Sequence, residues 1–275
     1  MSTMKSLRGN SASDRIIIAL MVVIDIVILY PFYYVLINSF NGMLSYGPSY
    51  LIPEQFSTIS YRVLFDTSDV LRAFTITISR TAAGTVLTVL NTAMCAYALK
   101  GRIRFRAIYL AFLVVPNFFR GGIIPRYLNF RSLGLLDNFF VYLLPTMFQF
   151  FYFVIFMSAF RDVPDSLEES AKMDGAGYFR IFFQIYLPLS LPIIATIALF
   201  AGVYQWNRWF DTVYFTRSNS LQTLSALLLK IVKQGEVQSI MDMDTSIGER
   251  NPEGIKFAAM VATILPIVFI YPFLQ

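Results

Sequence analysis

The chain has 275 residues, of which 56% are hydrophobic and only 14% are charged, an apolar share above that of ordinary soluble domains. This composition predicts an integral membrane protein, and a net charge of +5 gives no reason to expect a nucleic-acid partner. The absence of histidine and the presence of a single cysteine, Cys95, exclude a disulfide within the chain and a thiolate zinc site, and they remove the commonest general base.

Apolar runs long enough to cross a bilayer, which takes about 20 helical residues, recur along the chain. The six candidate spans are residues 16–40, 73–99, 107–119, 138–160, about 187–203 and 255–273. The third is short and is interrupted by Pro116 and by Gly121 and Gly122. The predicted fold is all-α, a polytopic membrane protein with about six transmembrane helices. A cytoplasmic N-terminus, residues 1–15, precedes a single transmembrane domain, residues 16–275.

Basic residues set the expected orientation, since lysine and arginine favour the cytoplasmic loops. The segment KGRIRFR at 100–106 and the N-terminal Lys5, Arg8 and Arg15 are therefore placed in the cytoplasm. With six spans, the segment 161–186 is then cytoplasmic as well. The segments expected outside are 41–72, 117–137 and about 206–254, although these long segments also carry arginines.

The cytoplasmic segment 161–186 begins as a charged helix. Asp165 and Glu168 have the spacing of a capping box, and Gly175 and Gly177 are expected to end the helix. We expect a positive φ at Gly175, which a leucine would resist.

A second helical run is expected over 178–185, before Pro188 and Pro192 open the fifth span. The segment is therefore predicted to form a helix-turn-helix joined directly to a membrane span. On the pattern alone, a loop that folds onto the membrane surface without a partner is an equal alternative.

The same segment resembles the EAA loop of permease subunits in bacterial ATP-binding-cassette (ABC) importers. The matching positions are Glu169, Ser170, Ala171, Gly175, Ile185, Leu187 and Pro188. In that family the short helix of the loop sits in a groove of the cytoplasmic ATPase subunit. The resemblance implies that Glu169 contacts the ATPase, that Asp174 and Gly175 shape the turn, and that Ala171 packs against the groove. Ser170 stands where the family usually has alanine.

Further segments resemble the carbohydrate-importer branch of that family, in particular permeases for oligosaccharides from plant or algal polysaccharides. These segments are 119–138, 206–215, 221–229 and 271–275. The resemblance implies a bacterial cytoplasmic (inner) membrane location and half of a translocation pathway. It also implies four kinds of partner besides membrane lipid: a homologous second permease subunit, two cytoplasmic ATPase subunits, an extracytoplasmic solute-binding protein and the oligosaccharide.

The chain has no phosphate-binding loop of the G-x-x-x-x-G-K-[ST] type. We therefore expect no enzymatic activity and no cofactor in this chain, with ATP and Mg bound by the partner ATPases. A proton-coupled secondary transporter is the competing class, because Asp25 and Arg80 fall within spans, where charges are usually functional. Asp25 bonded into a neighbouring span is the simpler interpretation. A membrane scaffold that transports nothing is a third class.

A sugar path needs flat apolar faces for the rings and hydrogen bonds for the hydroxyls. The predicted path residues are Arg80, Gln149, Tyr152, Gln205, Trp206, Asn207 and Arg208. An interfacial aromatic belt is the alternative for Trp206, Asn207 and Trp209, and a bond between helices is the alternative for Gln149.

Arginines gather in the predicted outer segments and at the outer end of the second span. They are Arg72, Arg80, Arg120, Arg126, Arg131 and Arg208. Because guanidinium groups bind carboxylates in bidentate fashion, we expect an acidic oligosaccharide such as alginate or pectin fragments, with neutral oligosaccharides as the alternative. For each arginine, contact with lipid headgroups or pairing with Asp66, Asp69, Asp137 or Asp211 is an alternative. The acidic segment 241–250 lacks the ligand register of a calcium loop, so no metal site is predicted.

Overall fold

A computed structural model describes residues 12–42, 51–101, 103–119, 121–241 and 252–274. Within these ranges the regular structure is helical, and the β-structure consists of an isolated bridge between Asn41 and Phe56. The predicted all-α class is therefore confirmed. The chain divides into two compact units, residues 1–66 with 232–262 and residues 67–231 with 263–275.

The first unit contains α1 (Ala12–Ser39) and α2 (Ile59–Asp66). Side chains along α1, such as Ile16 and Val27, are more than half exposed, which suits contact with lipid. Asp25 forms no hydrogen bond or ion pair with the described residues of this unit, so the predicted bond to a neighbouring span stays a prediction. At the end of α1 the Ser39 hydroxyl lies 2.7 Å from the Tyr61 hydroxyl, which ties α2 to α1.

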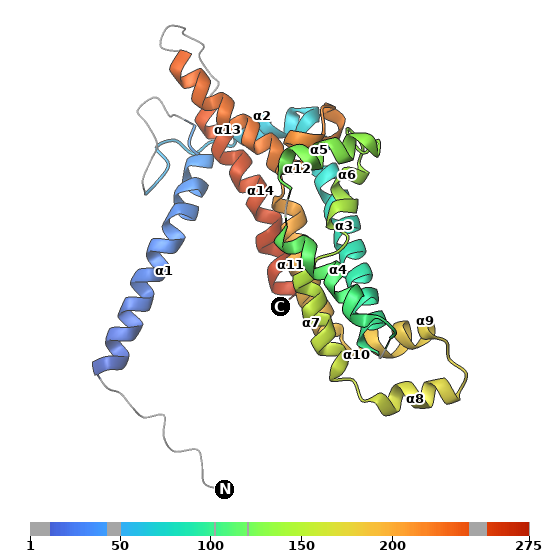
Figure 1. Ribbon diagram of the computed structural model, residues 1–275. Coiled ribbons are helices and arrows are strands. Elements are labelled where there is room, and N and C mark those ends of the chain that lie inside the picture. Colours follow the sequence, from blue (N-terminus) through green and yellow to red (C-terminus); the bar gives the residue numbers. More distant parts are fainter. Residues whose placement is uncertain (1–11, 43–50, 102, 120, 242–251, 275) are drawn as a thin grey trace. The chain divides into compact units, whose positions relative to one another are not determined.

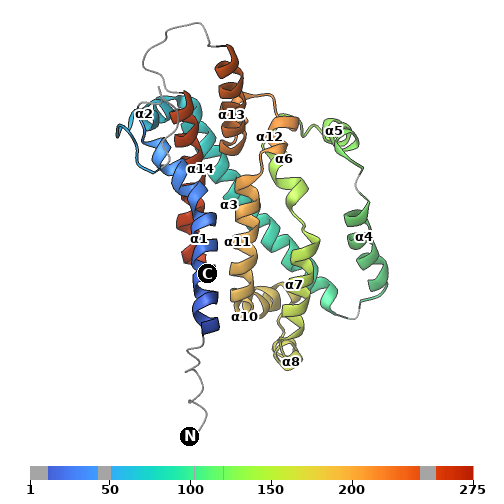
Figure 2. The ribbon, with the colours of Figure 1, turned by 90° about the vertical axis from the view of Figure 1, so that its left-hand side faces the viewer.

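The second unit is organised around α3 (Ser68–Lys100), which packs along α7 (Phe150–Arg161) and α11 (Leu191–Asn207), as Figures 1 and 2 show. At 1.5 Å per residue, this helix is about 50 Å long, enough to cross a bilayer. Its buried side chains recur at intervals of three and four and so share one face: Ala73, Thr77, Arg80, Gly84, Thr88, Thr92, Ala96 and Leu99. The small residues on this face allow the neighbouring helices to approach closely.

The predicted fourth span is not one straight helix. It comprises α6 (Phe140–Leu143), the 3-10 turn η1 (Leu144–Thr146) and α7, with a bend of 51° between Thr146 and Phe150. Pro145 removes a backbone donor at this point, and Gln149 has extended dihedrals, so the helix cannot continue through the break.

The predicted fifth span also differs, since it begins at Leu191 and not near residue 187. Residues 178–189 form a continuous helical stretch of α9 (Tyr178–Ile181), the π-helical turn η2 (Phe182–Tyr186) and α10 (Leu187–Leu189). After an 84° bend, α11 starts with Pro192 in its first turn. Pro188 therefore lies before the bend, and only Pro192 opens the span.

The third candidate span is interrupted at the glycines as predicted, into α4 (Arg106–Phe118) and α5 (Ile123–Ser132), with Gly122 at a φ of 80° between them. The predicted interruption at Pro116 is wrong, because α4 continues through this residue. The segment 206–254, expected as a loop, contains α12 (Phe210–Phe215), the 3-10 turn η3 (Asn219–Leu221) and α13 (Leu224–Met241) in its described part. Figure 2 places α5, α6 and α12 at one end of the second unit and α8 (Asp165–Met173) with α10 at the other.

Two of the described helices are long and apolar enough to cross a membrane as single helices, Asp14–Ser39 and Ser68–Lys100. The number rises to four if each bent pair is one span. The shorter apolar α4 and the 23-residue α14 (Pro252–Leu274) correspond to the other two predicted segments. The total of six spans stays a prediction.

Candidate functional site

The turn after α8 has the backbone conformation that the sequence predicts. Gly175 adopts a φ of 79°, in the left-handed region. Its N–H donates to the carbonyl of Lys172 at 3.0 Å, and the N–H of Ala176 donates to the carbonyl of Ala171 at 2.9 Å. These two bonds form a Schellman motif, in which glycine occupies the left-handed position and Asp174 the helix cap. The chain therefore reverses sharply after Met173.

The predicted capping box at the start of α8 is wrong. Pro164 occupies the cap position and no side chain caps the helix. Asp165 instead accepts a hydrogen bond from Lys100 at 3.1 Å, and Glu168 accepts one from the Tyr186 hydroxyl at 2.5 Å. Both carboxylates therefore bind partners outside α8, because Lys100 ends α3 and Tyr186 ends η2.

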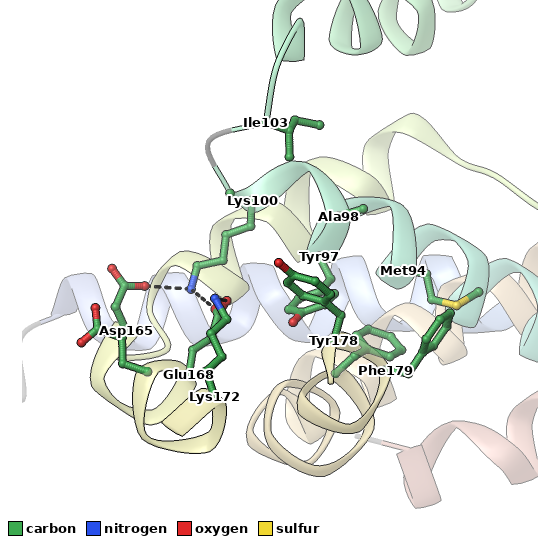
Figure 3. Close-up of a pocket in the computed structure, with 13 residues that line it drawn as sticks. Met94, Tyr97, Ala98, Lys100, Ile103, Asp165, Glu168, Lys172, Tyr178 and Phe179 are labelled. Carbon is green, nitrogen blue, oxygen red and sulfur yellow. Dashed lines mark hydrogen bonds and ion pairs between the residues drawn. The ribbon is translucent and has the colours of Figure 1, made fainter. Parts of the chain in front are cut away.

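These contacts belong to a group of five polar side chains, the Lys100 cluster: Lys100, Asp165, Glu168, Lys172 and Tyr186. The ammonium of Lys100 lies 2.5 Å from the Tyr186 hydroxyl and 3.8 Å from Glu168, and Lys172 binds Glu168 at 2.8 Å. Figure 3 shows Lys100 pointing toward Asp165 and Glu168 on α8. Partial burial acts to raise the pKa of Glu168, but hydrogen bonds from Lys172 and Tyr186 and the two lysine charges outweigh it and lower the pKa.

The π-helical turn η2 sets the position of Tyr186. A π-turn inserts an extra residue into a helix and is frequent at functional sites. The Tyr186 ring is fully buried and lies 4.8 Å from the ring of Tyr97 and 5.3 Å from that of Phe160. Three residues of the predicted coupling set lie on the same stretch: Ile185 and Leu187 are half-buried, and Pro188 is exposed.

Other side chains of the loop are open to solvent. Glu169, Ser170 and Asp174 are exposed, and Glu169 makes no hydrogen bond or ion pair within the described part of the chain. Ala171 differs, because its half-buried side chain packs against the chain's own apolar core. Its predicted contact with a partner's groove stays a prediction.

Large apolar side chains accompany Glu169 at this end of the molecule. Met173 is 89% exposed, and Tyr178 and Phe179 are 71% and 74% exposed. Between α3 and the loop lies a hollow of about 910 Å³, lined in part by Tyr97, Tyr178 and Phe179, which Figure 3 shows side by side. Exposed aromatic and thioether groups beside an unpaired carboxylate are typical of a surface that a protein partner covers.

A second polar group, the Arg80 network, lies in the interior of the same unit. Arg80 is fully buried, and its Nη2 donates to Asp211 at 2.9 Å, its Nε to Gln205 at 3.2 Å, and its Nη1 to the carbonyl of Arg208 at 2.7 Å. Its guanidinium also stacks 4.6 Å from the ring centroid of Tyr142. The prediction that Arg80 meets the cargo is therefore not supported, because internal partners occupy its guanidinium.

Asp211 is the centre of this network, since it binds two arginines. Arg208 donates to it from Nε at 2.5 Å and from Nη2 at 2.9 Å, in addition to the bond from Arg80. Pairing with an aspartate, the alternative for these arginines, is thus confirmed for Arg80 and Arg208, and the surface pair Arg72 with Asp69 confirms it for a third. Two guanidinium groups share one carboxylate, so the network keeps an excess positive charge.

Gln205 and Trp206, both predicted in the substrate path, are also buried. The Gln205 amide donates to the Thr146 hydroxyl at 2.7 Å, and the Trp206 indole donates to the carbonyl of Thr263 at 3.0 Å. A Cβ on Gly84 would lie 2.7 Å from Gln205 Cδ, so only glycine leaves room for this side chain. These residues hold the helices together, and an interfacial belt is not their role.

The other predicted path residues are accessible. Asn207 is exposed, Tyr152 is half-buried on α7, and the Arg208 side chain is 11% exposed beside the exposed Tyr204, to whose hydroxyl it donates. Gln149 lies half-buried at the break between η1 and α7, and its amide has no partner within the described residues. The predicted bond between helices is therefore not seen for Gln149.

Sequence reasoning missed Lys100, Tyr186, Tyr142 and Thr146 as members of these polar groups. The signal for Lys100 was its position at the end of an apolar span. From the sequence alone, this lysine indicated only the cytoplasmic side. No group of three or more potential metal ligands occurs among the described residues. Residues 242–251 lie outside them, so the prediction for the acidic segment stays a prediction.

An all-helical membrane chain with broken spans and a sharply turned, exposed loop has the architecture of a transport subunit. The family model described as "binding-protein-dependent transport system inner membrane component" matches residues 3–275, and the chain belongs to this family. It is thus a permease subunit of an ABC transporter and not a catalytic subunit.

The relatives include a permease named for polysaccharide transport. The chain is 35% identical over 273 residues to the polygalacturonan/rhamnogalacturonan transport system permease protein YtcP of Bacillus subtilis, covering 97% of this chain and 94% of that protein. It is 33% identical to protein LplC of the same organism, covering 99% of this chain and 94% of LplC. Family membership leaves the proton-coupled alternative without support.

A solved structure gives the same picture. The fold matches a chain in the crystal structure of a bacterial ABC transporter involved in the import of the acidic polysaccharide alginate, with a TM-score of 0.85 and 28% identity, covering 96% of this chain and 97% of that one. The predicted resemblance to the carbohydrate-importer branch is therefore confirmed.

Proposed function

We propose that this chain forms half of the translocation pathway of an importer for acidic oligosaccharides, driven by two ATPase subunits through the segment 161–186. The observation that carries the coupling is the loop itself. It combines a rigid glycine turn at Gly175, an unpaired exposed Glu169 and exposed Met173 and Phe179. These side chains are exposed, which leaves the surface open for a partner protein to cover.

The remaining partners follow from the family. A second homologous permease subunit completes the pathway, and an extracytoplasmic solute-binding protein delivers the sugar. ATP and Mg bind to the ATPase subunits, and the chain lies in the bacterial cytoplasmic membrane with its N-terminus in the cytoplasm. The basic segment 100–106 and the coupling loop then share the cytoplasmic side.

An acidic cargo is supported by two observations. Two of the three similar proteins described above are named for galacturonan and for alginate, both of them acidic polymers. In this chain, Arg126 and Arg131 on α5 are exposed and form no ion pair among the described residues, and Arg208 reaches the surface from a network with excess positive charge. Arg120 lies outside the described residues. A basic surface attracts carboxylated sugars over about 10 Å at moderate salt.

The test reconstitutes the complete transporter with its binding protein and measures ATPase stimulation by galacturonate oligomers and by neutral oligomers of equal length. We expect the acidic oligomers to stimulate at least tenfold more strongly, with the difference shrinking as salt rises. The variants Arg126→Gln and Arg131→Gln should weaken only the acidic response. Arg72→Gln is the control, because Arg72 already pairs with Asp69 at the surface.

Equal stimulation by both sugar classes would contradict the preference for acidic cargo and would leave the importer assignment in place. Uptake that a proton gradient drives without ATP would overturn the assignment to an ABC importer.

A further inference from the structure

Three elements of the second unit meet in the Lys100 cluster. Lys100 is the last residue of α3, Glu168 lies in the middle of α8, and Tyr186 is the last residue of η2. The three side chains form a continuous series of bonds, since Lys100 donates to the Tyr186 hydroxyl and this hydroxyl donates to Glu168, both at 2.5 Å. The long span, the loop helix and the elbow before the fifth span are thereby joined at one point.

The burial of these groups makes the joint stiff. The side chains of Lys100 and Glu168 are 12% and 19% exposed, and Tyr186 is fully buried. Hydrogen bonds to charged groups are about twice as strong as neutral ones, and partly buried pairs are screened little by salt. The Tyr97 ring, tilted by 53° to the Tyr186 ring, also packs against it from the α3 side.

We propose that Lys100, Tyr186 and Glu168 act as a positioning device that locks α8 to the end of α3, so that movement of the loop shifts the span instead of bending the loop. The inference rests on the proposed coupling function. It assigns positioning roles to Lys100 and Tyr186, which lie outside the loop positions expected to contact the ATPase. Lys172 has a different role, because it binds Glu168 from within the same helix and reaches a second element, α9, only through a cation–π contact of 5.7 Å with the Tyr178 ring.

The test uses the reconstituted complex and measures sugar taken up per ATP hydrolysed. Lys100→Met and Tyr186→Phe should leave assembly with the ATPase intact and lower this ratio at least fivefold, because hydrolysis continues while the span no longer follows the loop. Lys100→Arg should restore most of the ratio, since it keeps the donor and the charge. Lys172→Met, the matched control, should change the ratio by less than about twofold.

A ratio within about twofold of wild type for both Lys100→Met and Tyr186→Phe would overturn the proposal, as would an equal loss in Lys172→Met. Glu169→Lys in the same assay separates this failure from failure of the proposed function. If Glu169→Lys abolishes sugar-stimulated hydrolysis while the cluster variants behave as wild type, only the positioning role is wrong. If Glu169→Lys also behaves as wild type in an assembled complex, the coupling function itself is wrong.

Discussion

The Arg80 network and the Lys100 cluster use the same chemistry for different purposes. Each joins a cation, a carboxylate and a tyrosine from helices far apart in the sequence. Arg80 and Asp211 are excluded from solvent, with 0% and 1% of their side chains exposed, whereas exposure in the Lys100 cluster ranges from the buried Tyr186 to Asp165 at 83%. The first is closed and holds the helices in place, and the second continues into an exposed surface. Solvent exposure, more than residue type, therefore distinguishes the structural Arg80 network from the Lys100 cluster.

The largest expected effect comes from removing the carboxylate of the buried Arg80 network. Asp211→Asn should destabilise the protein by about 3–5 kcal/mol, because it leaves Arg80 buried without its counter-charge. The measurement is the thermal unfolding of the detergent-solubilised chain. Asp69→Asn is the matched control, since the Asp69–Arg72 pair is about half exposed and should contribute less than about 1 kcal/mol. Similar unfolding temperatures for the two variants would show that the buried Arg80–Asp211 pair stabilises the protein no more than the exposed Asp69–Arg72 pair.

A packing change tests the Arg80 network without altering its charge. Gly84→Ala should cost about 1–3 kcal/mol, because the added Cβ meets Gln205, which Arg80 and Thr146 hold in place. Gly101→Ala, where nothing lies within 4 Å of the new Cβ, should leave the unfolding temperature nearly unchanged. Equal stability of Gly84→Ala and wild type would show that Gln205 moves freely.

The turn of the loop gives a smaller change in stability with a larger change in function. Gly175→Leu should cost about 1–2 kcal/mol, because leucine resists the left-handed φ of 79°. Sugar uptake should fall at least tenfold, since the chain reversal after α8 sets the orientation of the surface proposed to bind the ATPase subunit. Gly177→Leu is the control, because Gly177 has a φ of −75° and open space around its Cβ. Normal uptake by Gly175→Leu would contradict the role of the turn.

The sequence predicted the features that depend on local chemistry. Gly175 was expected at a positive φ because a charged helix stops there, and the helical fold follows from the apolar runs. The sequence could not provide the partner of Arg80, because Asp211 lies 131 positions away and only the packing of α3 on α11 brings them together. The break at Gln149 had a local signal in Pro145, but a proline does not indicate whether a span bends or continues.

The smallest expected effect concerns protonation of the Lys100 cluster. Because the folded-state pKa of Glu168 is lowered, its contribution to stability is present above its ordinary pKa of about 4.3 and is lost as the pH falls through the lowered value. Glu168→Gln should therefore be less stable than wild type at pH 6, and the difference should shrink toward pH 3. A difference that stays constant over this range would show that the Glu168 charge adds nothing.

The central claim is that the exposed side of the loop is the surface on which the ATPase subunit docks. In a Cys95→Ala background, Met173→Cys places a thiol at a position that is 89% exposed in the chain alone, and Leu133→Cys, at a position 62% exposed beyond α5, is the control. The measurement is the rate of maleimide labelling in detergent, with and without the ATPase subunits. The account predicts that assembly slows labelling at Met173→Cys at least tenfold and leaves Leu133→Cys unchanged. Equal labelling rates at Met173→Cys before and after assembly, in a complex shown to contain the ATPase, would contradict it.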